Sequence, residues 1–168
     1  MKTLEQQMAV YAAYHRDARN KATHFVGVPA IVLSLLIALA WPRIEVGGVP
    51  ISAGMLIAAI LVAYYLVLDI PLSLAMLVVM AALVWLGHEI AALGALQAWS
   101  WFGVLFVGGW ILQLIGHVFE GRRPALTDNL FQIVVAPIFL AAEVFFALGY
   151  KPELHQRLNS VKARAERR

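Results

Sequence analysis

The sequence predicts an all-α protein, a polytopic transmembrane helix bundle of about five spans with an N-terminal amphipathic helix ahead of it. Of its 168 residues, 62% are hydrophobic and only 14% are charged, whereas an ordinary soluble domain carries roughly a quarter charged residues. Five apolar runs follow one another, at 25–41, 51–68, 70–87, 99–119 and 130–149. Each approaches the roughly 20 helical residues that cross a hydrocarbon core, so a single integral membrane domain is expected.

The segment before the first run, residues 1–23, is polar and charged and lacks the apolar stretch of a cleaved secretory signal. Within it, Leu4, Met8, Tyr11 and Tyr14 or His15 recur at helical spacing. We therefore expect an amphipathic interfacial segment over 1–23, whose helix lies on the membrane surface over Thr3–Asp17, a transmembrane bundle over 25–149 and a basic polar tail over 150–168.

Turn-forming residues separate the apolar runs. Pro42 and Gly47-Gly48 interrupt the first connection, and Asp69 and Pro71 mark a very tight second one. Lysines and arginines are nearly equal in number on the two sides of a five-span threading, so their distribution does not decide the orientation.

The composition also limits the chemistry. Cysteine is absent, which excludes disulfides, thiolate zinc sites, iron–sulfur clusters and a cysteine nucleophile, so any metal must use nitrogen or oxygen ligands. The basic tail contains no interleaved aromatic residue, which favours contact with anionic lipid headgroups of the bilayer and no nucleic-acid partner. The sequence does not decide whether the chain forms a homo-oligomer.

Histidines beside apolar runs are the main functional candidates, because ionisable groups in or next to lipid are costly. The five-span threading places His15, His24 and His117 on one side, where they can converge on a metal ion. His88 ends the third run on the opposite side and is a weaker candidate. On one continuous helix, the nine residues from His15 to His24 would turn by about 900° and place the rings on opposite faces, so a shared ion requires a break between them.

Polar neighbours of these histidines are candidates for second-shell residues or ligands. Glu120 follows His117 by three residues and shares its helical face, so it can be a ligand or can orient one. Asn20 and Asp128 are turn and cap formers that can also lie beside the site. Arg122 and Arg123 lie where an anionic head group meets the bilayer and suit either a substrate carboxylate or a lipid phosphate.

Two stretches of the chain carry a recognisable pattern. They are Tyr14-His15, Asn20, His24 and Val28-Pro29 in the first, and Gly116-His117, Phe119-Glu120, Arg122 to Leu126, Asp128-Asn129-Leu130, Gln132 and Ala136-Pro137 in the second. They resemble the 2-hydroxy-fatty-acid dioxygenase family, whose best-known members act in yeast phytosphingosine degradation at the endoplasmic reticulum. The second stretch, with the pattern GHxFExRRPALxDNL, is the more specific one.

The resemblance implies an Fe(II)-dependent membrane enzyme that uses dioxygen to shorten a 2-hydroxy fatty acid by one carbon, without 2-oxoglutarate. The metal-binding histidines of the family fall on His15, His24 and His117. The expected location is the bacterial inner membrane or, in a eukaryote, the endoplasmic reticulum. Two other classes stay open: a non-enzymatic small membrane transporter or scaffold, and another histidine-metal lipid-modifying enzyme such as a desaturase or hydroxylase.

Overall fold

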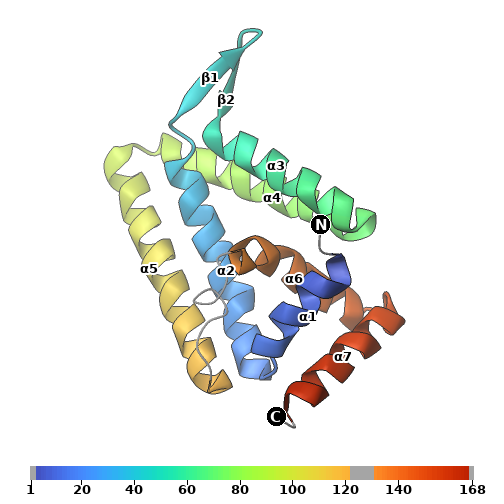
Figure 1. Cartoon of the computed structure of the whole chain (residues 1–168). Coiled ribbons are helices and arrows are strands. Elements are labelled where there is room, and N and C mark those ends of the chain that lie inside the picture. Colours follow the sequence, from blue (N-terminus) through green and yellow to red (C-terminus); the bar gives the residue numbers. More distant parts are fainter. Residues whose placement is uncertain (1–2, 122–130, 167–168) are drawn as a thin grey trace. The chain divides into compact units, whose positions relative to one another are not determined.

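The computed structural model describes residues 3–121 and 131–166. Helices dominate these ranges, which confirms the all-α class (Figure 1). The helices are α1 (Leu4–Tyr14), α2 (Ala18–Ala38), α3 (Ala53–Leu68), α4 (Ile70–Ala92), α5 (Ala95–Glu120), α6 (Gln132–Ala147) and α7 (Pro152–Glu166). An antiparallel hairpin of β1 (Arg43–Val46) and β2 (Val49–Ser52) connects α2 to α3.

Each of the five apolar runs corresponds to one helix, α2 to α6. Three of these, α2, α4 and α5, are long and apolar enough to cross a membrane by length and composition. The helix α6 and the first half of α7 form a pair bent by 113° that passes the same test only when taken together, and α3 is apolar but shorter than the other candidates. The described residues thus contain three candidate spans, or four with the bent pair, and the figure of about five stays a prediction.

The chain divides into two compact units, one of residues 1–25 and 113–168 and the other of residues 26–112. In the second unit, α3 and α4 pack side by side and Asp69 caps α4 by accepting the Leu72 N–H at 3.1 Å. Gly87 of α4 lies so close to α2 that an added Cβ would stand 3.2 Å from the backbone carbon of Leu36. Small residues therefore allow the close helix packing that is typical of membrane bundles.

The hairpin was not expected from the sequence. Its turn is Gly47-Gly48, and both glycines have positive φ, +60° and +80°, as a two-residue hairpin turn requires. The register pairs Ile44 with Ile51 and Val46 with Val49. Alternating apolar side chains therefore lie on one face of the hairpin, a period-two pattern that the surrounding apolar runs conceal in the sequence.

In the first unit, α1 packs against α6 and α7. Its buried side chains include Leu4, Met8 and Tyr11, three of the residues that recur at helical spacing. The helix begins at a capping box, in which Thr3 and Gln6 bond each other's backbone N–H groups. The expected apolar face is therefore real, and helices of the same unit cover it.

Two expected boundaries differ from the structure. The helix α2 begins at Ala18, inside the segment 1–23 that was expected to be amphipathic, because the side chain of Asp17 accepts the Arg19 N–H at 2.8 Å and starts the helix there. The tail 150–168 was expected to be basic and polar, with no helix assigned to it, and most of it forms α7, whose Leu158 is 2% exposed. One buried leucine and an acidic first turn were too weak a pattern to predict that helix.

Candidate metal centre

A break between α1 and α2 brings the first two histidines together. The helix α1 ends at Tyr14, His15 is its C-cap residue, and α2 starts at Ala18. This is the interruption that a shared ion requires, since a continuous helix would place His15 and His24 on opposite faces. Asn20, which could have capped the span, lies instead within the first turn of α2.

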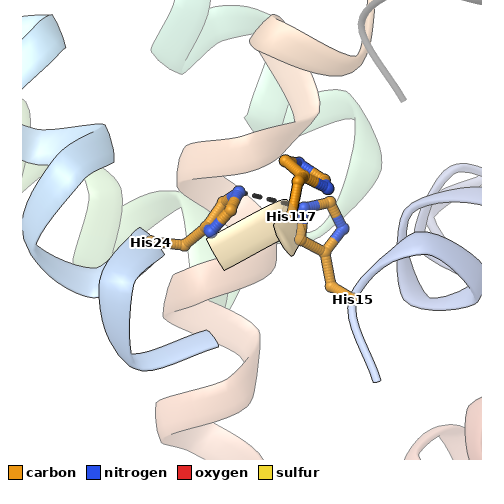
Figure 2. A group of neighbouring side chains, drawn as sticks. All are labelled: His15, His24 and His117. Atoms are coloured by element: carbon orange, nitrogen blue, oxygen red, sulfur yellow. Dashed lines mark hydrogen bonds between the residues drawn. The ribbon is translucent and has the colours of Figure 1, made fainter. Parts of the chain in front are cut away.

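Three histidines from α1's end, α2 and α5 point toward one another (Figure 2). Each offers one ring nitrogen, and these three atoms lie within 4.8 Å of one another. His15, His24 and His117 are only 2%, 3% and 6% exposed. The rings meet edge to face, with centroids 4.5 to 5.2 Å apart. Within the described residues, this is the group whose donor atoms suit a metal ion.

Hydrogen bonds to the backbone fix the tautomers of His15 and His24. The Nδ1 of His15 lies 2.9 Å from the Tyr11 carbonyl, and the Nδ1 of His24 lies 2.9 Å from the Asn20 carbonyl. A carbonyl oxygen only accepts, so each Nδ1 carries a proton and each Nε2 carries a lone pair when the ring is neutral. The two Nε2 atoms nevertheless lie 3.1 Å apart, a contact that needs a cation between them, either a shared proton or a metal ion.

A metal ion fits this arrangement. Two imidazole nitrogens bound to one ion at about 2.1 Å, in adjacent coordination positions, lie about 3 Å apart. His117 also has a ring nitrogen that can bind the ion, because its Nδ1 is buried and has no hydrogen-bond partner in the part of the chain that the structure describes. An all-imidazole donor set suits first-row metals such as iron, copper, nickel or zinc.

Glu120 holds the break in place and does not join the histidine group. Its two carboxylate oxygens accept the backbone N–H of Arg16 at 3.0 and 3.1 Å and that of Asp17 at 2.9 Å. They also accept the Nε–H of Arg16 at 3.3 Å and the amide of Asn20 at 3.0 Å. A carboxylate with both oxygens engaged this way orients the chain beside His15, as the outer shell of a metal site does.

Gly116 lets α5 approach α2 at the site. A Cβ added there would overlap Thr23 Oγ1 and lie 2.5 Å from Asn20 Oδ1 and 3.2 Å from the Nδ1 of His24. The amide of Asn20 is oriented with its NH₂ toward two acceptors, the Glu120 carboxylate and the Tyr14 carbonyl. Its oxygen therefore faces Gly116, where only a hydrogen atom fits.

Two charged pairs lie in the same unit as the site. Lys21 of α2 bonds Glu143 of α6 at 2.7 Å, and both side chains are largely covered. The guanidinium of Arg19 bonds Asp17, and these hydrogen bonds lower the pKa of the Asp17 carboxyl to about 2. Asp17 thus stays ionised as the cap of α2. Burial raises the pKa of Tyr11, whose ring stacks on His15 at 3.9 Å, so its phenol stays neutral.

Other candidates from the sequence are not part of this group. His88 lies on α4 in the second unit, where its Nδ1 bonds the Val84 carbonyl of its own helix at 2.8 Å. Arg122, Arg123 and Asp128 lie outside the described residues. Sequence reasoning missed the stacking of Tyr11 on His15, although its place four residues before His15 was a usable signal.

The fold and the site define a class of protein, a helical membrane protein with a buried centre of three histidines. The chain belongs to the Mpo1-like family, described as 2-hydroxy-palmitic acid dioxygenase Mpo1-like, whose model matches residues 1–148. The resemblance seen in the sequence is thereby confirmed.

A curated relative supports the assignment. The chain is 35% identical over 159 residues to the 2-hydroxy-palmitic acid dioxygenase MPO1 of Saccharomyces cerevisiae, and the match covers 92% of this chain and 87% of the yeast protein. No solved structure matches the chain.

Proposed function

We propose that this chain is an Fe(II)-dependent dioxygenase that removes one carbon from 2-hydroxy fatty acids with dioxygen, at the interface of a membrane. Membership of the Mpo1-like family supports the reaction. The observation that supports a bound metal ion is the 3.1 Å distance between the Nε2 atoms of His15 and His24, each of which carries a lone pair, with His117 beside them.

The reaction balances without an added reductant. One 2-hydroxy acid and one molecule of dioxygen give the acid that is one carbon shorter, carbon dioxide and water. The bond between the carboxyl carbon and C2 breaks, and C2 is oxidised from an alcohol to a carboxyl group. The carboxyl carbon leaves as carbon dioxide, and the electrons lost by these two carbons reduce dioxygen. The lack of a role for 2-oxoglutarate follows from this balance.

His15, His24 and His117 would hold the iron. When bound, Fe(II) would supply open coordination positions for the substrate's oxygens and the redox chemistry that dioxygen needs. The carbonyls of Tyr11 and Asn20 keep the Nδ1 protons of two ligands in place, which holds their lone pairs on Nε2 and strengthens them as donors. Burial of the three rings keeps bulk water from the centre.

The substrate would lie with its head at the end of α5 and its chain among apolar helices. Arg122 or Arg123 would receive the carboxylate, since a guanidinium can bind it through two hydrogen bonds. Each buried methylene of the acyl chain would add about 0.8 kcal/mol to binding. The lipid bilayer delivers such a substrate, whether the membrane is a bacterial inner membrane or that of the endoplasmic reticulum.

Metal analysis tests the centre. The full chain would be purified in detergent, reconstituted anaerobically with Fe(II) and desalted, beside His24→Ala, His117→Ala and the control His155→Ala. His155 stacks on Phe146 and is not in the three-histidine group, so its variant should retain iron while the other two lose it. Iron that stays stoichiometric in both ligand variants would exclude the site.

Product analysis tests the reaction. The iron-loaded protein would receive 2-hydroxypalmitate under air, and the expected product is the odd-chain acid, pentadecanoic acid. Palmitate, which lacks the hydroxyl, should not be shortened. An iron-loaded protein that leaves 2-hydroxypalmitate intact would instead favour a scaffold, a transporter or another lipid-modifying enzyme.

A further inference from the structure

The amide of Gln113 is a buried polar group that the metal centre does not use. Gln113 lies four residues before His117 on α5, so the two share a face of the helix with Cβ atoms about 5–6 Å apart. Side chains on a helix lean toward its N-terminus, which directs the ring of His117 over the turn that carries Gln113. Both residues belong to the first unit and are buried, at 7% and 6% exposure.

The Nε2 of Gln113 has no hydrogen-bond partner among the described residues. A buried polar group without a partner costs about 1–3 kcal/mol, and a candidate membrane span offers no bulk water to relieve that cost. The orphaned nitrogen of His117 can be explained by a metal ion. An amide N–H cannot bind a cation, so Gln113 requires a partner with an acceptor oxygen.

We propose that Gln113 binds the C2 hydroxyl of the substrate and thereby selects 2-hydroxy acids over ordinary fatty acids. This inference rests on the function proposed above. The helix α5 ends at Glu120, so Gln113 lies about one turn farther from that end than His117. We place the substrate with its carboxylate at the end of α5 and its chain along the span. C2, the carbon next to the carboxyl carbon, then lies on the side of the histidine group where the Gln113 amide lies.

The chemistry of the head group matches the amide. A hydroxyl both accepts and donates, so it can accept from Nε2 and also donate to an amide oxygen. A site built to bond a substrate hydroxyl rejects the analogue without it, because the polar group of the site is then left unpaired. Palmitate would leave the Gln113 amide without a hydrogen-bond partner, whereas the hydroxyl of 2-hydroxypalmitate would accept its hydrogen bond.

The test uses the full iron-loaded chain in detergent, with Gln113→Met and the control Gln97→Met. Methionine fills a similar volume without polar N or O atoms, and Gln97 is an exposed residue on the same helix. Binding of 2-hydroxypalmitate and of palmitate would be measured without dioxygen, so that no turnover occurs. Iron content and the thermal midpoint of the metal-free protein would be measured in parallel.

The expected result for Gln113→Met is about tenfold weaker binding of 2-hydroxypalmitate, with palmitate binding and iron content preserved. The thermal midpoint of the metal-free protein should be unchanged or higher, because the variant removes a buried unpaired amide. The control should match the wild type in every readout. If the wild type converts 2-hydroxypalmitate in air and Gln113→Met keeps the full preference for the hydroxy acid, the role of Gln113 is overturned and the proposed function stands. If the iron-loaded wild type neither binds nor converts the hydroxy acid, the proposed function fails and the inference fails with it.

Discussion

Replacing Glu120 by glutamine would separate a clamp on the helix break from a direct metal ligand. The carboxylate is 2% exposed and accepts N–H groups from Arg16, Asp17 and Asn20. A glutamine replaces one carboxylate oxygen by an NH₂ group. In either orientation of the amide, this NH₂ points at N–H groups that the oxygen had accepted. The variant loses the charged bond to Arg16 and leaves one or more donors unpaired, each worth about 1–3 kcal/mol. We expect the metal-free protein to lose about 2–4 kcal/mol of stability.

The same change should weaken the metal centre without abolishing it. A looser break lets His15 move relative to His24, and losing an outer-shell partner typically costs 10–100-fold in metal affinity. Thermal unfolding of the metal-free protein and anaerobic Fe(II) titration measure the two effects, with the exposed Glu45 of the hairpin changed to glutamine as a control. A variant with wild-type stability that binds no iron would mean that Glu120 is a ligand. A variant unchanged in both readouts would refute the clamp.

Three further outcomes follow from the geometry. Gly116→Ala should cost about 1–3 kcal/mol by overpacking and should reduce iron binding. Its control, Gly108→Ala, should be neutral or stabilising, because a Cβ added there meets nothing within 4 Å. If the two variants change the free energy of unfolding equally, the close packing at Gly116 is contradicted. Lys21→Met should cost about 1–3 kcal/mol because it removes the ion pair from the largely covered Glu143 carboxylate. Arg157→Met removes an exposed ion pair and should cost about 0.5 kcal/mol or less. Fe(II) at about 100-fold over its Kd should stabilise the wild type against thermal unfolding by about 2.7 kcal/mol. It should not stabilise His117→Ala. If Fe(II) stabilises the two proteins equally, the histidine site is excluded.

Much of this architecture was predictable because lipid imposes a simple rule on sequence. Apolar runs of membrane length must be helical, since lipid cannot satisfy a bare backbone, and all five runs are indeed helices. The convergence of His15 and His24 was also predictable in one respect. Helical rotation alone shows that both rings can reach one ion only if the chain breaks between them, and α1 ends at Tyr14.

The parts that could not be predicted depend on contacts between distant segments. The hairpin lies in a stretch where the strand pattern is only four residues long on each side, and β-structure is specified by pairing more than by local preference. The role of Glu120 was left between ligand and second shell, because its helical face is known from the sequence but its partners, the N–H groups of Arg16 and Asp17, lie more than 100 residues away. Nothing in the sequence indicates that pairing.

The positions of the three proposed ligands explain why a carboxylate clamps the break. His24 and His117 lie on long continuous helices, which hold their side chains precisely, whereas His15 lies where the backbone is no longer helical. Sites on helices are more precise than sites on loops, so the side chain of His15 is the one whose position must be fixed by another group. Glu120 lies one turn from His117 on α5 and bonds the two residues after His15. Any shift of α5 therefore moves His117 and the anchor of His15 together, and the bond from Asn20 to the same carboxylate ties α2, which carries His24, to that anchor.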